Sequence, residues 1–134
     1  MESQTSQNFL KILHFNDVYV MEERDQDVQI EKTGVFTRGG AARFVTAMKA
    51  HGCDEKLVLF SGDLLSPSLL SRFFKGHQFV EVFDKLNVRA TCLGNHDVFD
   101  FGAQNLKDFI AASDERRKKK KREPNKWLMA NFYT

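Results

Sequence analysis

The sequence has few cysteines and no long apolar run. Cys53 and Cys92 are the only cysteines in 134 residues, which excludes a disulfide framework, and their spacing does not fit a cysteine metal site. Cys92 lies within an apolar run, where we expect a buried free thiol. No segment reaches the roughly 18 apolar residues of a membrane span, so no transmembrane segment is expected.

The first residues also lack an export signal. Residues 1–8 are polar and do not contain the apolar core of a signal peptide. If Met1 is the natural start, the protein is therefore expected to be cytoplasmic.

Length and composition limit the chain to one globular domain or part of one. Apolar residues make up 42% of the sequence and charged residues 28%, values that argue against disorder. The chain has 134 residues and can bury one core. It is well short of the roughly 250 residues of a large α/β domain.

The positive charge is concentrated in one run. Residues 116–122 are seven consecutive basic residues, and without them 13 basic residues face 18 acidic ones, a net charge of −5. The surrounding segment 113–126 has the composition of a solvated basic insertion loop. Such a loop is a candidate for binding anions, either nucleic acid or anionic lipid, or for nuclear import; the alternative is a solvated helix end. No aromatic residue interrupts the run, so base stacking is not indicated.

Strand and helix patterns alternate along the chain. Short apolar runs predict strands, and apolar residues at helical spacing predict helices between them. Strands are expected at 12–13, 57–60, 88–93 and 127–130, helices at 40–50, 78–86 and 103–112, and an exposed loop at 22–27. Because the connections are helical, the strands should pair in parallel. We therefore expect an α/β fold with a mainly parallel sheet and flanking helices.

Oxygen-bearing side chains follow three of these strands. Asp17, Asp63 and Asn95 each come after an apolar run, and sites in α/β sheets form outside the carboxyl ends of parallel strands. Carboxylate and amide oxygens suit Mn²⁺, Fe²⁺, Zn²⁺ or Mg²⁺. Gly62 and Gly94 allow sharp turns there and leave room for a metal or phosphate. The pattern predicts a metal site at this edge of the sheet.

Six short segments in a fixed order carry a family resemblance. They are 12–17, 39–43, 61–67, 94–97, 99–102 and 129–131. In these segments the chain resembles the calcineurin-like metallophosphoesterase superfamily, most closely its 5′-nucleotidase branch. The resemblance implies a four-layer α/β/β/α metallophosphoesterase domain, of which residues 1–134 would form the first half.

The resemblance also implies roles for individual residues. Asp17 would bind the first of two divalent metal ions, Asp63 would bridge both, and Asn95 would bind the second. Asn95 and His96 would contact the phosphate of the substrate. His96 would act as the catalytic acid that protonates the leaving oxygen.

An aspartate near His96 would orient its ring. Val98 is one extra residue relative to the family pattern, so both Asp97 and Asp100 are open as the partner. Asp100 is favoured, because residues 99–102 keep the family register.

The implied activity is divalent-metal-dependent hydrolysis of phosphoesters. More specifically, the resemblance implies 5′-nucleotidase-like action on nucleotides or other phosphomonoesters, with metal-activated water as the nucleophile. The identity of the metal, Mn, Zn, Fe or Mg, stays open.

Two departures from the family pattern affect the metal site. Tyr19 stands where the family usually has histidine, and a neutral tyrosine, with a pKa near 10, is a poor ligand. No histidine follows His96, although the family completes its site with later histidines. The chain is therefore expected to carry half of a metal site, and to expose apolar sheet surface that favours marginal stability or a homodimer. The alternative is a non-catalytic binding module that kept the fold and lost the site.

Overall fold

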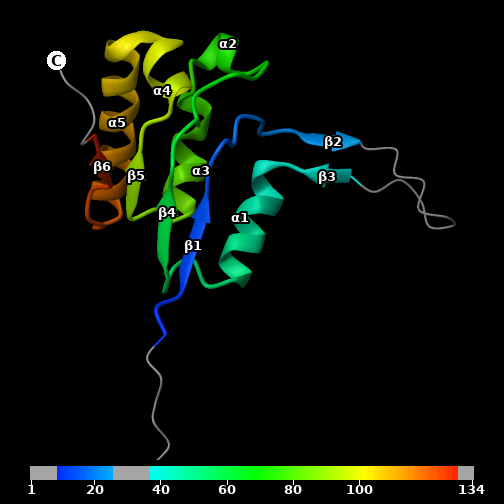
Figure 1. The fold of residues 1–134 in the computed structure, drawn as a ribbon, viewed down its shortest axis with the longest axis vertical. Coiled ribbons are helices and arrows are strands. Elements are labelled where there is room, and N and C mark those ends of the chain that lie inside the picture. Colours follow the sequence, from blue (N-terminus) through cyan, green and yellow to red (C-terminus); the bar gives the residue numbers. More distant parts are fainter. Residues whose placement is uncertain (1–8, 26–36, 130–134) are drawn as a thin grey trace, which may run out of the picture.

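A four-stranded parallel sheet forms the centre of the molecule (Figure 1). The structure is a computed structural model and describes residues 9–25 and 37–129. Across the sheet the order is β1 (Ile12–Phe15), β4 (Leu57–Phe60), β5 (Ala90–Cys92) and β6 (Lys126–Leu128). Each neighbouring pair is parallel. The predicted α/β class with a mainly parallel sheet is confirmed.

The connections between these strands hold a hairpin and several helices. The helical elements are α1 (Ala41–Ala50), α2 (Ser71–Phe74), the 3₁₀ turn η1 (His77–Phe79), α3 (Val80–Lys85), α4 (Asn95–Phe99) and α5 (Gly102–Lys119). β2 (Glu23–Asp25) pairs antiparallel with β3 (Thr37–Gly39). The exposed loop predicted at 22–27 is therefore wrong for residues 23–25, because their backbone groups pair with a second strand. Residues 26 and 27 lie outside the described residues.

Aromatic side chains hold the helices against one face of the sheet. The register places Phe15 of β1 beside Phe60 of β4, and their rings lie 4.9 Å apart. Phe44 of α1 packs on Phe15 at 5.2 Å, and Phe83 of α3 packs on Phe60 at 5.6 Å. Phe83 also stacks on Trp127 of β6 at 5.8 Å. These contacts join three strands and two helices into one core.

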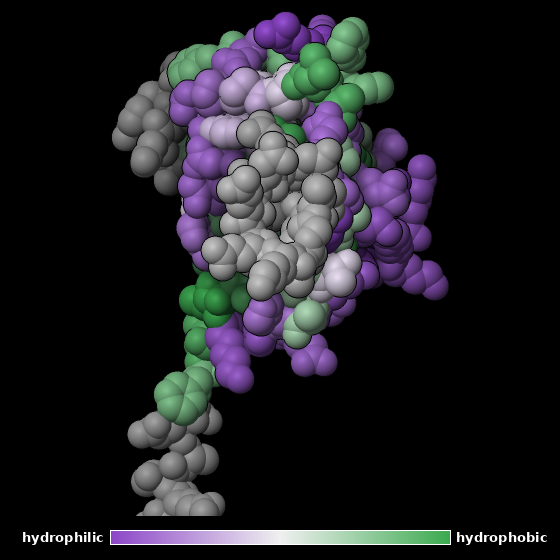
Figure 2. Space-filling view, turned by 90° about the vertical axis from the view of Figure 1, so that its right-hand side faces the viewer, coloured by the Kyte–Doolittle hydropathy of each residue, from purple (hydrophilic) through white to green (hydrophobic). Residues whose placement is uncertain are grey.

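Among the described residues, nothing covers the opposite face of the sheet. Ile12 is 48% exposed and Leu128 53% exposed, and Cys92 is exposed as well. The predicted burial of the Cys92 thiol is therefore wrong, because its strand is covered on one face only. Parallel sheets are normally covered on both faces. Exposed apolar residues also lead into β1, where Phe9 is 75% and Leu10 76% exposed. Figure 2 shows apolar residues gathered at the lower end of the face in view. Homodimerisation through this surface stays a prediction.

The basic run is largely helical. α5 extends to Lys119, so the loop predicted at 113–126 is wrong for residues 113–119. The alternative, a helix end that runs into a loop, describes this segment correctly. Arg117 is only 1% exposed, and its Nε donates to the backbone carbonyl of Glu123 at 2.5 Å. Burial of one guanidinium and the helical hydrogen bonds fix this segment in place. Burial, the first cause, and the nearby Arg122 lower the pKa of Arg117.

Several of the other basic residues lie around one buried carboxylate, that of Asp84. Asp84 on α3 is fully buried and forms an ion pair with Lys120. Its carboxylate also lies 3.5 Å from Arg122 Nη1 and 3.6 Å from Arg116 Nε. The inward-facing cations are therefore part of the packing, and anion binding by the rest of the run stays a prediction.

No helix in the part of the chain that the structure describes is long and apolar enough to cross a membrane.

Candidate functional site

The candidate site residues lie at the carboxyl ends of β1, β4 and β5, the upper end of the sheet in Figure 1. Asp17 follows β1, Asp63 follows β4, and Asn95 and His96 begin α4 after β5. Because these three strands are neighbours in the sheet, their loops meet. The predicted convergence of the loops is thus present in the fold.

Both aspartates have left-handed backbone conformations. The φ angles are 54° for Asp17 and 66° for Asp63, values that are uncommon outside glycine but tolerated best by Asp and Asn. The Asp17 N–H donates to the carbonyl of Gly62 at 3.1 Å, and the Val18 N–H donates to the carbonyl of Asp63 at 3.1 Å. These bonds hold the two loops together and keep both residues in a strained conformation, which is common at functional sites.

Gly62 and Gly94 let the β4 and β5 loops touch. A Cβ on Gly62 would lie 2.3 Å from the Gly94 nitrogen, and a Cβ on Gly94 would lie 1.9 Å from Asp63 Oδ1. Gly62 also has a φ of 98°. Any side chain at Gly94 would therefore push the Asp63 carboxylate away from its present position.

The Asp97 side chain holds the β4 and β5 loops together. Its carboxylate is buried and accepts hydrogen bonds from the backbone N–H groups of Asp63, Leu64, Leu65 and Gly94, at 2.7, 2.8, 2.9 and 3.0 Å. Asp97 is the third residue of α4, so its bond to Gly94 is one half of a capping box. The other three bonds attach the start of α4 to the β4 loop.

His96 forms hydrogen bonds with Asp63 and Asp100. Its backbone N–H donates to Asp63 Oδ1 at 3.0 Å, and its ring Nδ1 lies 2.8 Å from Asp100 Oδ2. Ser66 donates its hydroxyl proton to the same Asp100 oxygen. The structure thus places Asp100, and not Asp97, against the imidazole. The hydrogen bond to Asp100 raises the pKa of His96, while the bonds from Ser66 and His96 lower the pKa of Asp100.

We expect the His96–Asp100 pair to be visible in the pH dependence of the metal-free chain. The pKa of His96 is raised from 6.5 in the folded chain. The contribution of protonated His96 to the stability of the fold is therefore complete below pH 6.5 and is lost as pH rises through this raised pKa. Because the Asp100 pKa is lowered from 3.8, the effect of Asp100 is present above pH 3.8 and is lost as pH falls through the folded value. An NMR titration of the His96 ring should therefore move to lower pH in Asp100→Asn.

The matched control is Asp108→Asn, which removes a carboxylate that accepts from Gln104 on α5. This variant should leave the His96 titration in place. An equal shift in both variants would mean that general charge, and not the contact with Asp100, sets the His96 pKa.

Tyr19 also belongs to the site. Its hydroxyl lies 2.6 Å from Asp17 Oδ1 and 3.1 Å from Asp63 Oδ2. Its ring meets the His96 ring edge-on at 5.7 Å. Burial, followed by the hydrogen bonds to Asp17 and Asp63, raises the pKa of Tyr19. The sequence marked Tyr19 as a departure from the family pattern but did not predict that it contacts both carboxylates.

A family model, calcineurin-like phosphoesterase, matches residues 10–132. The chain belongs to this family. Members generally use divalent metal ions, and membership supports phosphoester hydrolysis as the general chemistry. A search of curated proteins found no match.

Solved structures agree with the family assignment. A 5′-nucleotidase precursor from Thermus thermophilus is 27% identical, with a TM-score of 0.68 over 91% of this chain and 22% of that one. The fold is also similar to that of the NAD nucleotidase NadN of Haemophilus influenzae, which is 24% identical with a TM-score of 0.69, over 91% of this chain and 20% of that one. The calcineurin-like phosphoesterase YfkN of Bacillus subtilis is 22% identical with a TM-score of 0.54, over 78% and 34% of the two chains. This chain therefore spans between one fifth and about one third of these proteins.

The oxygen donors of this candidate site are of the type that suits a hard divalent cation. Asp17 and Asp63 supply carboxylate oxygens that share contact with one hydroxyl, and the exposed Asn95 supplies an amide at the start of α4. Within residues 9–25 and 37–129, no three His, Cys, Asp or Glu side chains group as metal ligands. The residues present thus match a divalent cation in donor type and would supply part of a ligand set.

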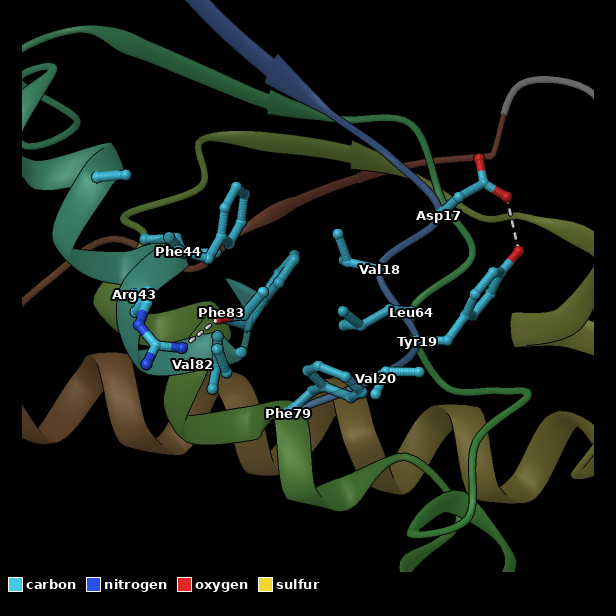
Figure 3. A pocket seen from close by; sticks show the side chains of 15 residues that line it. Asp17, Val18, Tyr19, Val20, Arg43, Phe44, Leu64, Phe79, Val82 and Phe83 are labelled. Atoms are coloured by element: carbon cyan, nitrogen blue, oxygen red, sulfur yellow. Dashed lines mark hydrogen bonds between the residues drawn. The ribbon is translucent and has the colours of Figure 1, made fainter. Parts of the chain in front are cut away.

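An apolar pocket of about 560 Å³ adjoins Asp17 (Figure 3). Phe44 of α1, Phe79 of η1 and Val82 of α3 line it, together with Val18 and Val20. Figure 3 shows the Tyr19 hydroxyl directed toward Asp17. The pocket and the carboxylate site thus share the segment after β1.

Proposed function

We propose that this chain supplies metal and phosphate ligands of a divalent-metal-dependent phosphoesterase with 5′-nucleotidase-like action on nucleotides. The observation that carries the proposal is the meeting of two carboxylates with a histidine–aspartate pair at the ends of three adjacent strands. Two of the similar structures are named as nucleotidases, which supports a nucleotide or another phosphomonoester as substrate.

Asp17, Asp63 and Asn95 would hold the metal ions, two in number by analogy with the family. Divalent ions such as Mn²⁺ supply an activated water and neutralise charge on the phosphoryl oxygens. The backbone bond from His96 to Asp63 at 3.0 Å would keep this carboxylate fixed relative to the catalytic histidine. Asn95 and His96, adjacent at the start of α4, would contact the phosphate.

His96 would give its proton to the leaving oxygen. Nδ1 is held by Asp100 at 2.8 Å, which leaves Nε2 as the nitrogen that faces substrate. The raised pKa of His96, caused first by the bond to Asp100, keeps the ring protonated nearer to neutral pH. Asp100 acts through the ring and is therefore a positioning residue.

Residues 1–134 would form one part of a larger metallophosphoesterase domain. The open sheet face supports this proposal, because a parallel sheet is normally covered on both sides. A second sheet on that face would cover Ile12 and Leu128, which are 48% and 53% exposed.

Hydrolysis of p-nitrophenyl phosphate and adenosine monophosphate with and without Mn²⁺ tests the function. The 134-residue chain is compared with Asp63→Asn, and Mn²⁺ binding is measured on the same samples. Mn²⁺-dependent hydrolysis that disappears in Asp63→Asn supports the proposal, because Asp63 is central to the site. Mn²⁺ binding that needs Asp63, without hydrolysis, assigns the ligands to this chain and the reaction to the larger domain. Hydrolysis that is unchanged in Asp63→Asn contradicts the proposal.

A second candidate function is a binding module that kept the fold without the reaction. The contacts of the Tyr19 hydroxyl with both carboxylates favour it. A module of this kind should bind Mn²⁺ no more tightly than millimolar, both before and after Asp63→Asn.

A further inference from the structure

The Tyr19 hydroxyl lies where the two candidate metal-binding carboxylates come together. It is 2.6 Å from Asp17 Oδ1 and 3.1 Å from Asp63 Oδ2. A phenol has one proton, so it can donate one full hydrogen bond to only one carboxylate at a time. The shorter distance assigns this bond to Asp17, and the contact with Asp63 is weaker.

Other contacts hold Tyr19 in this place. Its ring packs edge-on against His96 at 5.7 Å. The N–H of its neighbour Val18 donates to the Asp63 carbonyl at 3.1 Å, which holds the backbone on one side of Tyr19. Asn16 donates from its side chain to the second oxygen of Asp17. Donors of this chain therefore already contact both oxygens of Asp17.

A cation would compete for the same oxygens. Divalent ions bind carboxylate oxygens at about 2.0–2.6 Å, according to the metal. A cation held by Asp17 and Asp63 would lie at least as close to their oxygens as the Tyr19 hydroxyl does at 2.6 and 3.1 Å, and its positive charge would repel the hydroxyl proton. A carboxylate oxygen has two lone pairs, but a bound cation withdraws negative charge from it, so the hydrogen bonds from the hydroxyl and the binding of the ion weaken each other.

We propose that Tyr19 is an internal competitor for the metal, so that a divalent cation binds Asp17 and Asp63 together only when the Tyr19 hydroxyl leaves them. This inference rests on the proposed metal-dependent function and deepens it, because it names the residue that limits metal occupancy. The displaced hydroxyl keeps its proton, and no covalent bond changes.

Tyr19→Phe separates competition from ligation. The variant removes the hydroxyl and keeps the ring against His96, so the fold should be retained. If Tyr19 competes, the affinity for Mn²⁺ should rise about tenfold, in keeping with the strength of a hydrogen bond to a charged group. If Tyr19 is instead a ligand, the affinity should fall.

The affinity is measured by electron paramagnetic resonance of free Mn²⁺, without substrate. His14→Gln is the matched control and should leave the Mn²⁺ affinity unchanged. His14 also hydrogen-bonds at these strand ends, to Ser61 at 2.6 Å, and the hydrogen bonds described for Asp17 and Asp63 do not involve it. Asp63→Asn should abolish the gain when combined with Tyr19→Phe. An affinity of Tyr19→Phe that is equal to or weaker than that of the wild type, or no binding by either protein, overturns the inference.

Hydrolysis assays on the same samples distinguish the proposed phosphoesterase function from the proposed competition by Tyr19. Tighter Mn²⁺ binding by Tyr19→Phe without hydrolysis supports competition and contradicts hydrolysis by this chain. Mn²⁺-dependent hydrolysis that needs Asp63, with no gain of affinity in Tyr19→Phe, supports the function and contradicts competition.

Discussion

Replacing Asp84 by alanine is expected to lower the free energy of unfolding by about 3 kcal/mol. Asp84 is fully buried, whereas the side chains of Arg116, Lys120 and Arg122 around it are 38%, 41% and 36% exposed. These cations can turn toward water once the carboxylate is gone. The expected loss therefore lies at the lower end of the range for a broken buried ion pair. Urea unfolding at pH 7 measures it.

Glu81→Ala provides the matched control on the same helix. The Glu81 side chain is 57% exposed and pairs with Arg116 at 3.1 Å and with Lys85 at 3.6 Å. Its removal should cost less than about 1 kcal/mol, because exposed pairs are solvated and screened. Equal losses in the two variants would mean that Asp84 is no more important than a surface acid.

The contacts of Asp84 explain why the basic run was predicted only in part. Composition alone predicted a solvated loop or a solvated helix end, because seven cations in sequence carry no local sign of a buried partner. That partner lies on α3, 36 residues before Lys120. Its selection depends on how α3 packs against α5, which only the assembled fold determines.

The strands and the site loops were more accessible to sequence reasoning. Apolar runs predicted β1 and β4 because buried strands need apolar residues on their covered face. Asp17 and Asp63 could be predicted to meet because parallel strands end at one edge of the sheet. The spacing of His96 and Asp100 is also local, since residues four apart lie on one face of a helix.

The hydrogen bonds by which Asp97 holds the site loops could not be predicted in the same way. The carboxylate of Asp97 bonds to the β4 loop, more than 30 residues away in the sequence. The one local signal is its position three residues after Gly94, which favours a helix cap. The remaining bonds depend on the close approach of Gly62 and Gly94.

Replacing Asp97 by asparagine is expected to destabilise the chain by about 3 kcal/mol and to weaken Mn²⁺ binding, although the two side chains have nearly the same shape. Each Asp97 oxygen accepts two backbone N–H groups. An asparagine amide would turn its NH₂ group toward two of these donors. Two buried N–H groups would lose their acceptors, at about 1–3 kcal/mol each. Urea unfolding and Mn²⁺ titration measure the two effects.

Asp100→Asn is the control for this change. The Asp100 side chain is 35% exposed, so water can replace its lost contacts, and the cost should stay below about 1 kcal/mol. Asp97→Asn should reduce stability and Mn²⁺ binding together, because either orientation of the amide removes at least one of the bonds that hold the β4 loop around Asp63. Loss of stability with normal Mn²⁺ affinity would show that the Asp63 carboxylate is positioned without Asp97, by its bond to His96 and the backbone bonds to the β1 loop alone.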